Sequence, residues 1–342
     1  MITMYDVAKA AGVSKSTVSN VFSQKRPISK EVRERVLDIA KQLNYKPNYM
    51  ARSLAIKETG IIGLSLIGEK IKFSQFHLSF MNGVLNECYK QGYRLLVNTL
   101  SEEYKHQVSN VASDPVDGEI ILAPSKNDSR IREKEANNIP LVVIGKPPEE
   151  FEDKLSYVDN NNSQAAAQVA EYLLEMGHEN ILFLNAPKIR TVSGEREKGY
   201  MEALEKIGMK HNQQTILYRS EKLTSIDFGF KTTVKMLTDN PRITAVVTDN
   251  DKVALGVYRA AKGMGLSIPN DLSVVAFSDG SMFSPELTPP LTCMRLNGEV
   301  LGSESTKLLL EQIKAEHKIM KRIIVPIELE ERGSTARVEN NT

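Results

Sequence analysis

The chain has 342 residues and carries 44 lysines and arginines against 43 aspartates and glutamates, so its formal net charge is +1 at pH 7. This length can bury the cores of two or three domains. No run of eighteen apolar residues and no signal-peptide pattern occurs, which argues against a membrane-spanning or exported protein and favours a cytoplasmic one.

Few residues suggest redox, metal or catalytic chemistry. Cys88 and Cys293 lie in apolar contexts, so we expect both to be buried and reduced. The five histidines are scattered without metal-ligand spacing, and neither a G-x-S-x-G elbow nor a phosphate-binding glycine loop is present. We therefore expect no metal, no cofactor and no enzymatic activity.

Residues 3–20 predict two helices joined by a tight turn. Thr3 can cap the first helix, Gly12 supplies the backbone freedom of the turn, and Ser14 can cap the second helix. The apolar positions expected inside are Val7, Ala8, Ala11, Val18 and either Val21 or Phe22. The second helix then presents hydrogen-bonding side chains outward, as base edges and phosphates require. These residues are Lys15, Ser16, Ser19 and Asn20.

A third helix is expected after Ser29, which can cap it, with Glu31 and Glu34 near its positive end. Its apolar stripe consists of Val32, Val36, Ile39, Ala40 and Leu43. A small helical bundle without DNA-binding function is the alternative reading of these three helices. Charge favours the DNA-reading one, because residues 1–58 hold eleven basic and five acidic residues while the remainder holds 33 and 38.

The segment after the third helix predicts a short helix that forms only in a complex. Pro47 disfavours helical geometry before it, so the third helix should stop near Tyr45. Asn48 can cap a helix over 49–55, which is too short to be stable alone and should form only with DNA or a partner chain. Its Leu54 could wedge between base steps in the minor groove, with ordinary packing against the rest of the chain as the alternative.

From about residue 60 the pattern changes to short apolar runs alternating with helical segments. The expected strands are 61–67, 93–97, 118–122, 141–144, 180–184, 245–248 and 272–277, with a helix over 80–89. Such runs are typical of parallel sheets covered on both faces. They are too many for one compact open sheet, so two lobes are expected. Ligands in such folds lie beyond the carboxyl ends of the strands.

Several motifs resemble the LacI/GalR family of bacterial transcription regulators. They are Tyr5-Asp6-Val7-Ala8, Ala11-Gly12-Val13-Ser14, Thr17-Val18-Ser19, Leu43-Asn44-Tyr45 with Pro47-Asn48, and Ala51-Arg52-Ser53-Leu54-Ala55. The resemblance continues through nearly the whole chain. It implies an all-α helix-turn-helix head and an α/β two-lobed body like a type I periplasmic binding protein.

The resemblance also implies the domain boundaries. They are a DNA-binding domain over 1–47, a hinge over 48–59, an effector-binding and dimerisation domain over 60–337 and a disordered tail over 338–342. The chain should cross between lobes near 158–160, 289–291 and 323–326. The first lobe would hold 60–158 and 291–322, and the second 159–290 and 323–337.

The DNA contacts implied by the resemblance fall into three groups. Base reading is expected from Lys15, Ser16 and Asn20, although the family often has arginine where Asn20 stands. Phosphate contacts are expected from Thr17, Ser19, Asn44, Tyr45 and Asn48. The minor-groove hinge residues would be Met50, Ala51, Arg52 and Leu54.

Effector contacts are implied at positions that mostly follow strands. They are Ser74, Gln75, Phe76, His77, Ser125, Lys146, Arg196, Asn250, Ser278 and Asp279. Arg196 matches the family's effector-gripping arginine, and Asn250 matches an asparagine that binds effector hydroxyls and can also cap a helix. Where Ser278 stands the family usually has aspartate, which appears here one place later as Asp279. For His77, packing and ligand contact are both open.

Together these features predict a homodimeric repressor of a carbohydrate uptake or catabolism operon. It would bind a palindromic operator and be relieved by a small sugar, with a ligand that tightens DNA binding as the alternative. Phe80, Val84 and Tyr104 are expected at the dimer interface. Two other classes are a sugar-binding protein with an unrelated helical head and a nucleoid architectural protein that binds without sequence choice.

Overall fold

The computed structural model describes residues 2–23, 26–46, 53, 58–66, 73–98, 115–208, 216–220, 222–280, 282–317 and 320–338. The chain divides into two compact units, a head of residues 1–61 with 113–117 and a body of 62–112 with 118–342. In these ranges, no helix has both the length and the apolar character needed to cross a membrane.

The head is built from α1 (Met4–Ala11), α2 (Lys15–Ser23) and α3 (Lys30–Gln42). The backbone N–H of Thr3 donates to Asp6 Oδ2 at 2.8 Å, which begins α1, and Gly12 ends it with φ of 64°. Ser14 Oγ accepts from the backbone N–H of Thr17 at 3.1 Å and so caps α2. The predicted turn and caps are therefore confirmed.

The head has its own apolar core, to which all three helices contribute. Its buried members are Val7, Ala8, Ala11, Val18, Val21, Val36 and Ala40. Phe22 packs against this core while partly exposed, so Val21 is the more deeply buried of the two candidates. Helix α3 ends earlier than predicted, because Asn44 adopts a left-handed conformation (φ 52°) ahead of Pro47. The expected helix over 49–55 lies outside the described residues, apart from Ser53.

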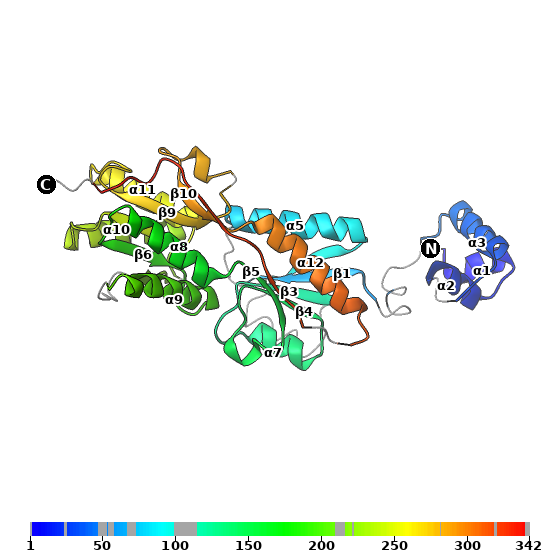
Figure 1. Ribbon diagram of the computed structural model, residues 1–342. Helices are drawn as coiled ribbons and strands as arrows, with labels where there is room; N and C mark the ends of the chain where they lie inside the picture. Colours follow the sequence, from blue (N-terminus) through cyan, green and yellow to red (C-terminus); the bar gives the residue numbers. More distant parts are fainter. Residues whose placement is uncertain are drawn as a thin grey trace. The chain divides into compact units, whose positions relative to one another are not determined.

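The first sheet of the body has the strand order β11-β5-β4-β3-β1-β2. Its strands are β1 (Ile61–Ser65), β2 (Arg94–Asn98), β3 (Gly118–Leu122), β4 (Leu141–Ile144), β5 (Ser156–Asp159) and β11 (Arg322–Ile324). In the parallel register, Leu64 pairs with Ile120 and Ile120 with Val142, and this row points into one core. Helices α5 (Gln75–Gln91) and α12 (Gly298–Lys314) cover that face, and α7 (Ser129–Ala136) covers the other (Figure 1).

The second sheet has the order β12-β10-β9-β8-β6-β7. Its strands are β6 (Ile181–Asn185), β7 (Ile216–Tyr218), β8 (Ala245–Thr248), β9 (Ser273–Ser278), β10 (Thr292–Arg295) and β12 (Glu328–Glu330). Helices α8 (Asn162–Glu175) and α9 (Thr191–Lys206) pack on one face. Helices α10 (Ser225–Asp239) and α11 (Asp251–Gly263) pack on the other. The expected two-lobed α/β body with parallel sheets is confirmed, with β12 antiparallel to β10.

One predicted crossing between lobes and one predicted lobe boundary need correction. Strand β10 pairs with β9 and β12 in the second sheet, so the chain returns to the first lobe after Arg295 and not near 289–291. The two prolines at 289 and 290 precede this strand and do not link the lobes. Strand β11 pairs with β5 in the first sheet, so the last crossing follows Ile324, within the predicted range 323–326. The first lobe therefore extends to 324 and does not end at 322.

The predicted interface residues Phe80 and Val84 are wrong, since both are fully buried between α5 and the first sheet. Tyr104 lies outside the described residues. The opposite face of α5 instead exposes large apolar side chains, with Leu78 at 46%, Leu85 at 45% and Tyr89 at 88% exposure. Helical spacing places these three residues on one face.

Candidate functional site

The head presents the predicted DNA-contacting residues at the start of α2 and just after α3. Lys15 and Ser16 are exposed in the first turn of α2, and Thr17, Ser19 and Asn20 are half-buried. Asn44 is exposed in the turn after α3. Tyr45 packs its ring against Phe22 of α2 with the ring centroids 5.8 Å apart, which holds the two regions together. Asn48, Met50, Ala51, Arg52 and Leu54 lie outside the described residues.

The body contains a cavity of about 290 Å³ lined by both lobes. Its wall includes residues that immediately follow strands of both sheets, namely Leu66, Ala123, Gly145, Asn160, Ala186, Arg219 and Asp249. The cavity therefore lies where the carboxyl ends of parallel strands face one another, as expected for a ligand site in such folds. Phe76, Leu122, Ile144, Phe277 and Leu296 supply apolar surface.

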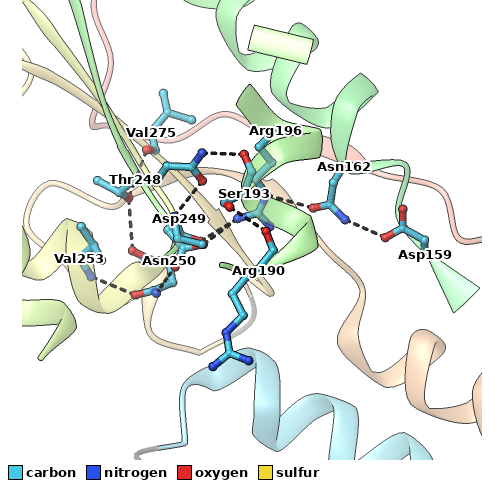
Figure 2. Close-up of polar contacts among 12 residues, drawn as sticks. Asp159, Asn162, Arg190, Ser193, Arg196, Thr248, Asp249, Asn250, Val253 and Val275 are labelled. Atoms are coloured by element: carbon cyan, nitrogen blue, oxygen red, sulfur yellow. Dashed lines mark hydrogen bonds and ion pairs between the residues drawn. The ribbon is translucent and has the colours of Figure 1, made fainter. Parts of the chain in front are cut away.

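Arg196 is the centre of a hydrogen-bonded cluster in this wall (Figure 2). Its side chain is only 4% exposed, and its Nη1 donates to Asp249 Oδ1 at 2.9 Å. Its Nε donates to Asn162 Oδ1 at 2.9 Å, and Asn162 Nδ2 in turn donates to Asp159 Oδ1 at 2.7 Å. The guanidinium lies 4.0 Å from the centroid of the Phe277 ring. Contacts from α8, α9, β8 and β9 thus set its orientation.

Burial controls the charges in this cluster. It raises the pKa of Asp159, against hydrogen bonds from Asn160 and Asn162 that lower it. Burial also lowers the pKa of Arg196, which the nearby carboxylates of Asp249 and Asp159 oppose. Because a guanidinium stays protonated in proteins, Arg196 and Asp249 form a buried ion pair.

Asn250 has the helix-capping role that its position predicted. Its Oδ1 accepts from the backbone N–H of Val253 at 3.0 Å, which caps α11, and its Nδ2 donates to Asp249 Oδ2 at 2.9 Å. Asn250 also lines the cavity. Both roles are compatible in this structure, and contact with an effector stays a prediction.

His77 is a neutral histidine at the cavity wall. Its Nδ1 accepts from the backbone N–H of Ser74 at 3.3 Å and lies 2.7 Å from Ser74 Oγ, which makes it part of the cap of α5. Burial and the positive charge of Lys252 lower its pKa to about 4, although Asp249 opposes this shift. With Nδ1 accepting, the ring proton is on Nε2.

The cavity brings together only part of the predicted effector set. Ser74, Phe76, His77, Arg196 and Asn250 line it. The others have different partners in the structure and stay untested as effector contacts: Gln75 donates to Ser79, Ser125 accepts from Arg190, Lys146 pairs with Glu152 and Glu195, and Ser278 accepts from Gly280.

Asp279 joins the lobes instead of lining the cavity. Its carboxylate accepts from Ser79 Oγ of α5 and from the backbone N–H of Gly298 at the start of α12, both at 2.8 Å. Phe277 on β9 reaches the cavity, and the backbone beyond the strand turns Asp279 toward the first lobe. Lys146 also links the lobes, since its Nζ lies 3.8 Å from Glu195 of α9.

Several cavity residues escaped the sequence analysis. Asp159 lies in a predicted crossing between lobes and Asn162 lies just after it, so the polar residues of that linker could have indicated the site. Arg190, Arg219 and Lys252 also line the cavity. Arg219 follows β7, a strand of three residues that was not predicted, and without that strand nothing marked the arginine as a site residue.

Comparisons with known proteins agree with this architecture. Residues 3–48 match the family model for bacterial regulatory proteins of the lacI family, and 170–335 match that for a periplasmic binding protein-like domain. The HTH-type transcriptional repressor PurR of Erwinia tasmaniensis is 32% identical over 98% of this chain and 97% of its own length. PurR of Proteus mirabilis is also 32% identical, over 98% of this chain and 97% of its own.

This chain belongs to the lacI family.

Solved structures support the assignment over the full length. The Lac repressor dimer bound to operator and the anti-inducer ONPF has a TM-score of 0.82 at 27% identity, covering 98% of this chain and 99% of that one. The regulator CelR in complex with cellobiose has a TM-score of 0.75 at 27% identity, covering 98% and 100%. A lacI-family regulator from Enterococcus faecium with bound ribose has a TM-score of 0.68 at 26% identity, covering 82% and 100%.

As a lacI-family member, the protein is a DNA-binding transcriptional repressor and not an enzyme. Its helical head matches the family's DNA-binding unit, and its body matches the unit that binds a small-molecule effector.

Proposed function

We propose that this lacI-family repressor acts in the cytoplasm as a homodimer on a palindromic operator and that a small sugar in the body cavity releases it. The observation that carries the proposal is the cavity of about 290 Å³ at the facing strand ends, with Arg196 held in its wall. A bacterial repressor acts on chromosomal DNA, which supports a cytoplasmic location.

The cavity wall suits a sugar. Hydroxyl groups need paired donors and acceptors, which Asn160, Thr191 and Ser225 offer beside the Arg196 cluster. Phe76 adds an aromatic surface for the apolar side of a sugar ring. Two structural relatives, CelR with cellobiose and the Enterococcus faecium regulator with ribose, bind sugars themselves.

The exposed apolar face of α5 supports a dimer. Leu78, Leu85 and Tyr89 form one stripe on a helix whose other side is the lobe core. Large apolar side chains exposed along one helix face are a common mark of a protein interface. A twofold axis at this patch would bury it against its own copy and provide two heads for two half-sites.

The mechanism follows from the lobes that line the cavity. A ligand held by both lobes favours one relative orientation of them, by as much as its affinities for the two orientations differ. In a dimer the lobe orientation would set the separation of the two segments over 49–55, which precede the first lobe. A ligand that moves them apart lowers operator affinity, and one that brings them together raises it.

The test is electrophoretic retardation of a palindromic duplex in excess nonspecific DNA. We expect the wild-type protein to bind one duplex as a dimer and to be released by a sugar from a panel that includes ribose and cellobiose, with a purine base as a non-sugar probe. Arg196→Ala should bind the duplex but lose the release, because the cluster around Arg196 is removed. Arg242→Ala, an exposed arginine of the second lobe, is the control.

Each part of the proposal has its own contrary result. If a sugar still released Arg196→Ala from the duplex, the cavity would not be the effector site. Stronger retardation of the duplex in the presence of ligand would establish co-repression. Release by the purine base but not by any sugar would contradict the assignment of a sugar as the effector. Equal retardation of all sequences would support an architectural protein.

A further inference from the structure

Two loops from opposite lobes pair with each other beside the cavity. Residues 123–126 follow β3 of the first sheet, and residues 186–190 follow β6 of the second sheet. Ser125 of the first loop and Arg190 of the second form an antiparallel bridge. This pairing, the interlobe bridge, joins the two lobes through their main chains.

Main-chain hydrogen bonds hold the interlobe bridge together. The backbone N–H of Lys126 donates to the carbonyl of Ile189 at 2.8 Å, and that of Thr191 donates to the carbonyl of Pro124 at 3.1 Å. Thr191 Oγ1 donates to the same Pro124 carbonyl at 3.4 Å. The two main-chain bonds flank the bridged pair on both sides, as in an antiparallel ladder. The lobes therefore meet here as a short piece of sheet.

The side chain of Arg190 strengthens this contact. It extends away from the Arg196 cluster (Figure 2), and its Nη1 donates to the carbonyl of Ala123 at 3.2 Å and to Ser125 Oγ at 3.1 Å. Ala123 adopts a left-handed conformation with φ of 52°, which is unfavourable for a residue with a Cβ atom. Such a conformation persists only where surrounding contacts hold it, and the hydrogen bond from Arg190 to its carbonyl is one of them.

The loop of the first lobe is anchored to its own sheet. The backbone N–H of Ser125 donates to Asp128 Oδ2 at 3.0 Å, and Asp128 forms an ion pair with Arg130 at 2.7 Å, both side chains being buried. Arg130 in turn donates to the carbonyls of Ser65 and Leu122, where β1 and β3 end. A pull on the interlobe bridge is therefore transmitted to the sheet.

The interlobe bridge lies apart from the places where the chain crosses between lobes. In the first sheet β4 separates β3 from β5, after which the chain crosses. In the second sheet β8 and β9 separate β6 from β10, after which it crosses again. The lobes are thus fastened at two separate places, so they cannot rotate about the crossings unless the bridge breaks.

We propose that the interlobe bridge is a latch that fixes the lobe orientation in which the repressor binds its operator, and that a releasing effector acts by opening it. Pro124 and Thr191 both line the cavity, so a ligand there touches the two halves of the latch. Thr191 is also the first residue of α9, the helix that carries Arg196. The link to operator binding rests on the proposed function, whereas the latch itself does not.

A designed disulfide tests whether the latch is closed. Residues paired in this way have Cα atoms about 4.5 Å apart, within the range of about 4.4–6.8 Å that a disulfide spans. Ser125→Cys/Arg190→Cys in the full chain should therefore cross-link readily with oxidised glutathione, as mass spectrometry of the linked peptides would show. Ser125→Cys/Ile189→Cys is the matched control, because a shift of one residue turns the side chain to the opposite face.

We expect the bridged pair to cross-link about tenfold or more faster than the shifted pair, since a disulfide needs both short separation and aligned Cβ atoms. The oxidised Ser125→Cys/Arg190→Cys protein should then retard a palindromic duplex at least as strongly as its reduced form. Equal cross-linking of the two pairs, or weaker operator binding after oxidation, would overturn the latch.

Hydrogen exchange of the wild-type chain tests the opening. A sugar that releases the operator should speed the exchange of the Lys126 and Thr191 amides by about tenfold or more, because opening frees both N–H groups. Unchanged or slower exchange with that sugar would refute the proposed route of release while leaving the proposed function standing. Failure to retard any palindromic duplex would contradict the proposed function and leave the cross-linking result unaffected.

Discussion

His77 illustrates how a single side chain can serve the fold and the cavity together. It occupies the third position of α5, where a glutamate or glutamine often closes a capping box, and its Nδ1 accepts from the Ser74 backbone. Because Nδ1 is used in this way, the Nε2–H is the group left to donate. The ring also lines the cavity, so its neutral state affects both helix stability and the local charge.

The lowered pKa of His77 predicts a pH-dependent stability. The pKa of His77 is near 6.5 in the unfolded chain and about 4 in the folded chain. Between these pH values the histidine is protonated in the unfolded chain and neutral in the folded chain. The free energy of unfolding therefore falls as pH falls through this window. We expect a loss of about 2 kcal/mol between pH 7 and pH 4.5 from this group.

Urea unfolding of the wild type and of His77→Gln measures this loss. Glutamine can keep the capping hydrogen bond without titrating. Burial also lowers the pKa of His178, whose contribution is common to both proteins and cancels in their difference. Two stability curves that stay parallel from pH 7 to pH 4.5 would show that His77 is not the source.

At the scale of elements, the helix pairs of the body depend on glycines where they cross. A Cβ atom at Gly302 of α12 would lie 2.1 Å from the carbonyl oxygen of Phe80 in α5, and one at Gly83 would lie 2.0 Å from that of Glu299. Gly199 of α9 faces the Ser163 carbonyl equally closely. These helices pack backbone to backbone, which places α5 and α12 close enough for Asp279 to bond both.

Gly302→Ala should destabilise the body. The added methyl group overlaps backbone atoms that cannot rotate away, so we expect a loss of about 1–3 kcal/mol in the free energy of unfolding. Gly263→Ala in α11 is the matched control, because nothing lies within 4 Å of its Cβ and alanine favours a helix. Thermal unfolding of both variants tests this prediction. Equal unfolding midpoints for the two would show that the α5–α12 crossing tolerates a side chain at position 302.

At the scale of the whole molecule, contacts across the two lobes accompany the cavity. Asp279 of the second lobe bonds α5 and α12 of the first, and Arg190 Nη1 donates to Ser125 Oγ at 3.1 Å. Helix α5 connects three parts of the molecule. Its N-terminal cap lies at the cavity wall, its Ser79 donates a hydrogen bond to Asp279, and its outer face exposes Leu85 and Tyr89. A change of lobe orientation would therefore act on the helix that we propose as the dimer contact.

Leu85→Arg should weaken the dimer. A charge placed on the apolar stripe of α5 would face its own copy across the twofold axis, where burying it is costly. We expect a shift toward monomer in sedimentation equilibrium and a loss of operator affinity of about tenfold or more. Ile207→Arg, at an exposed apolar position at the end of α9, is the control. A dimer that survives Leu85→Arg would place the interface elsewhere.

Local sequence patterns are enough to predict the head and the class of the body. Caps at Thr3 and Ser14, the turn at Gly12 and the apolar spacing of Val7, Val18 and Val36 act within a few residues, so they can be read without the fold. The uneven charge of the head and body and the short apolar runs of the parallel strands are likewise properties of segments.

Which residues come into contact depends on how the whole chain folds. Strand β10 belongs to the second sheet because it pairs with β9. The carboxylate of Asp279 accepts a hydrogen bond at the start of α12, and Phe80 is a core residue because α12 covers it. Arg219 reached the cavity behind a strand of three residues, too short to show a pattern. These outcomes depend on contacts between distant segments, which local spacing and propensity do not encode.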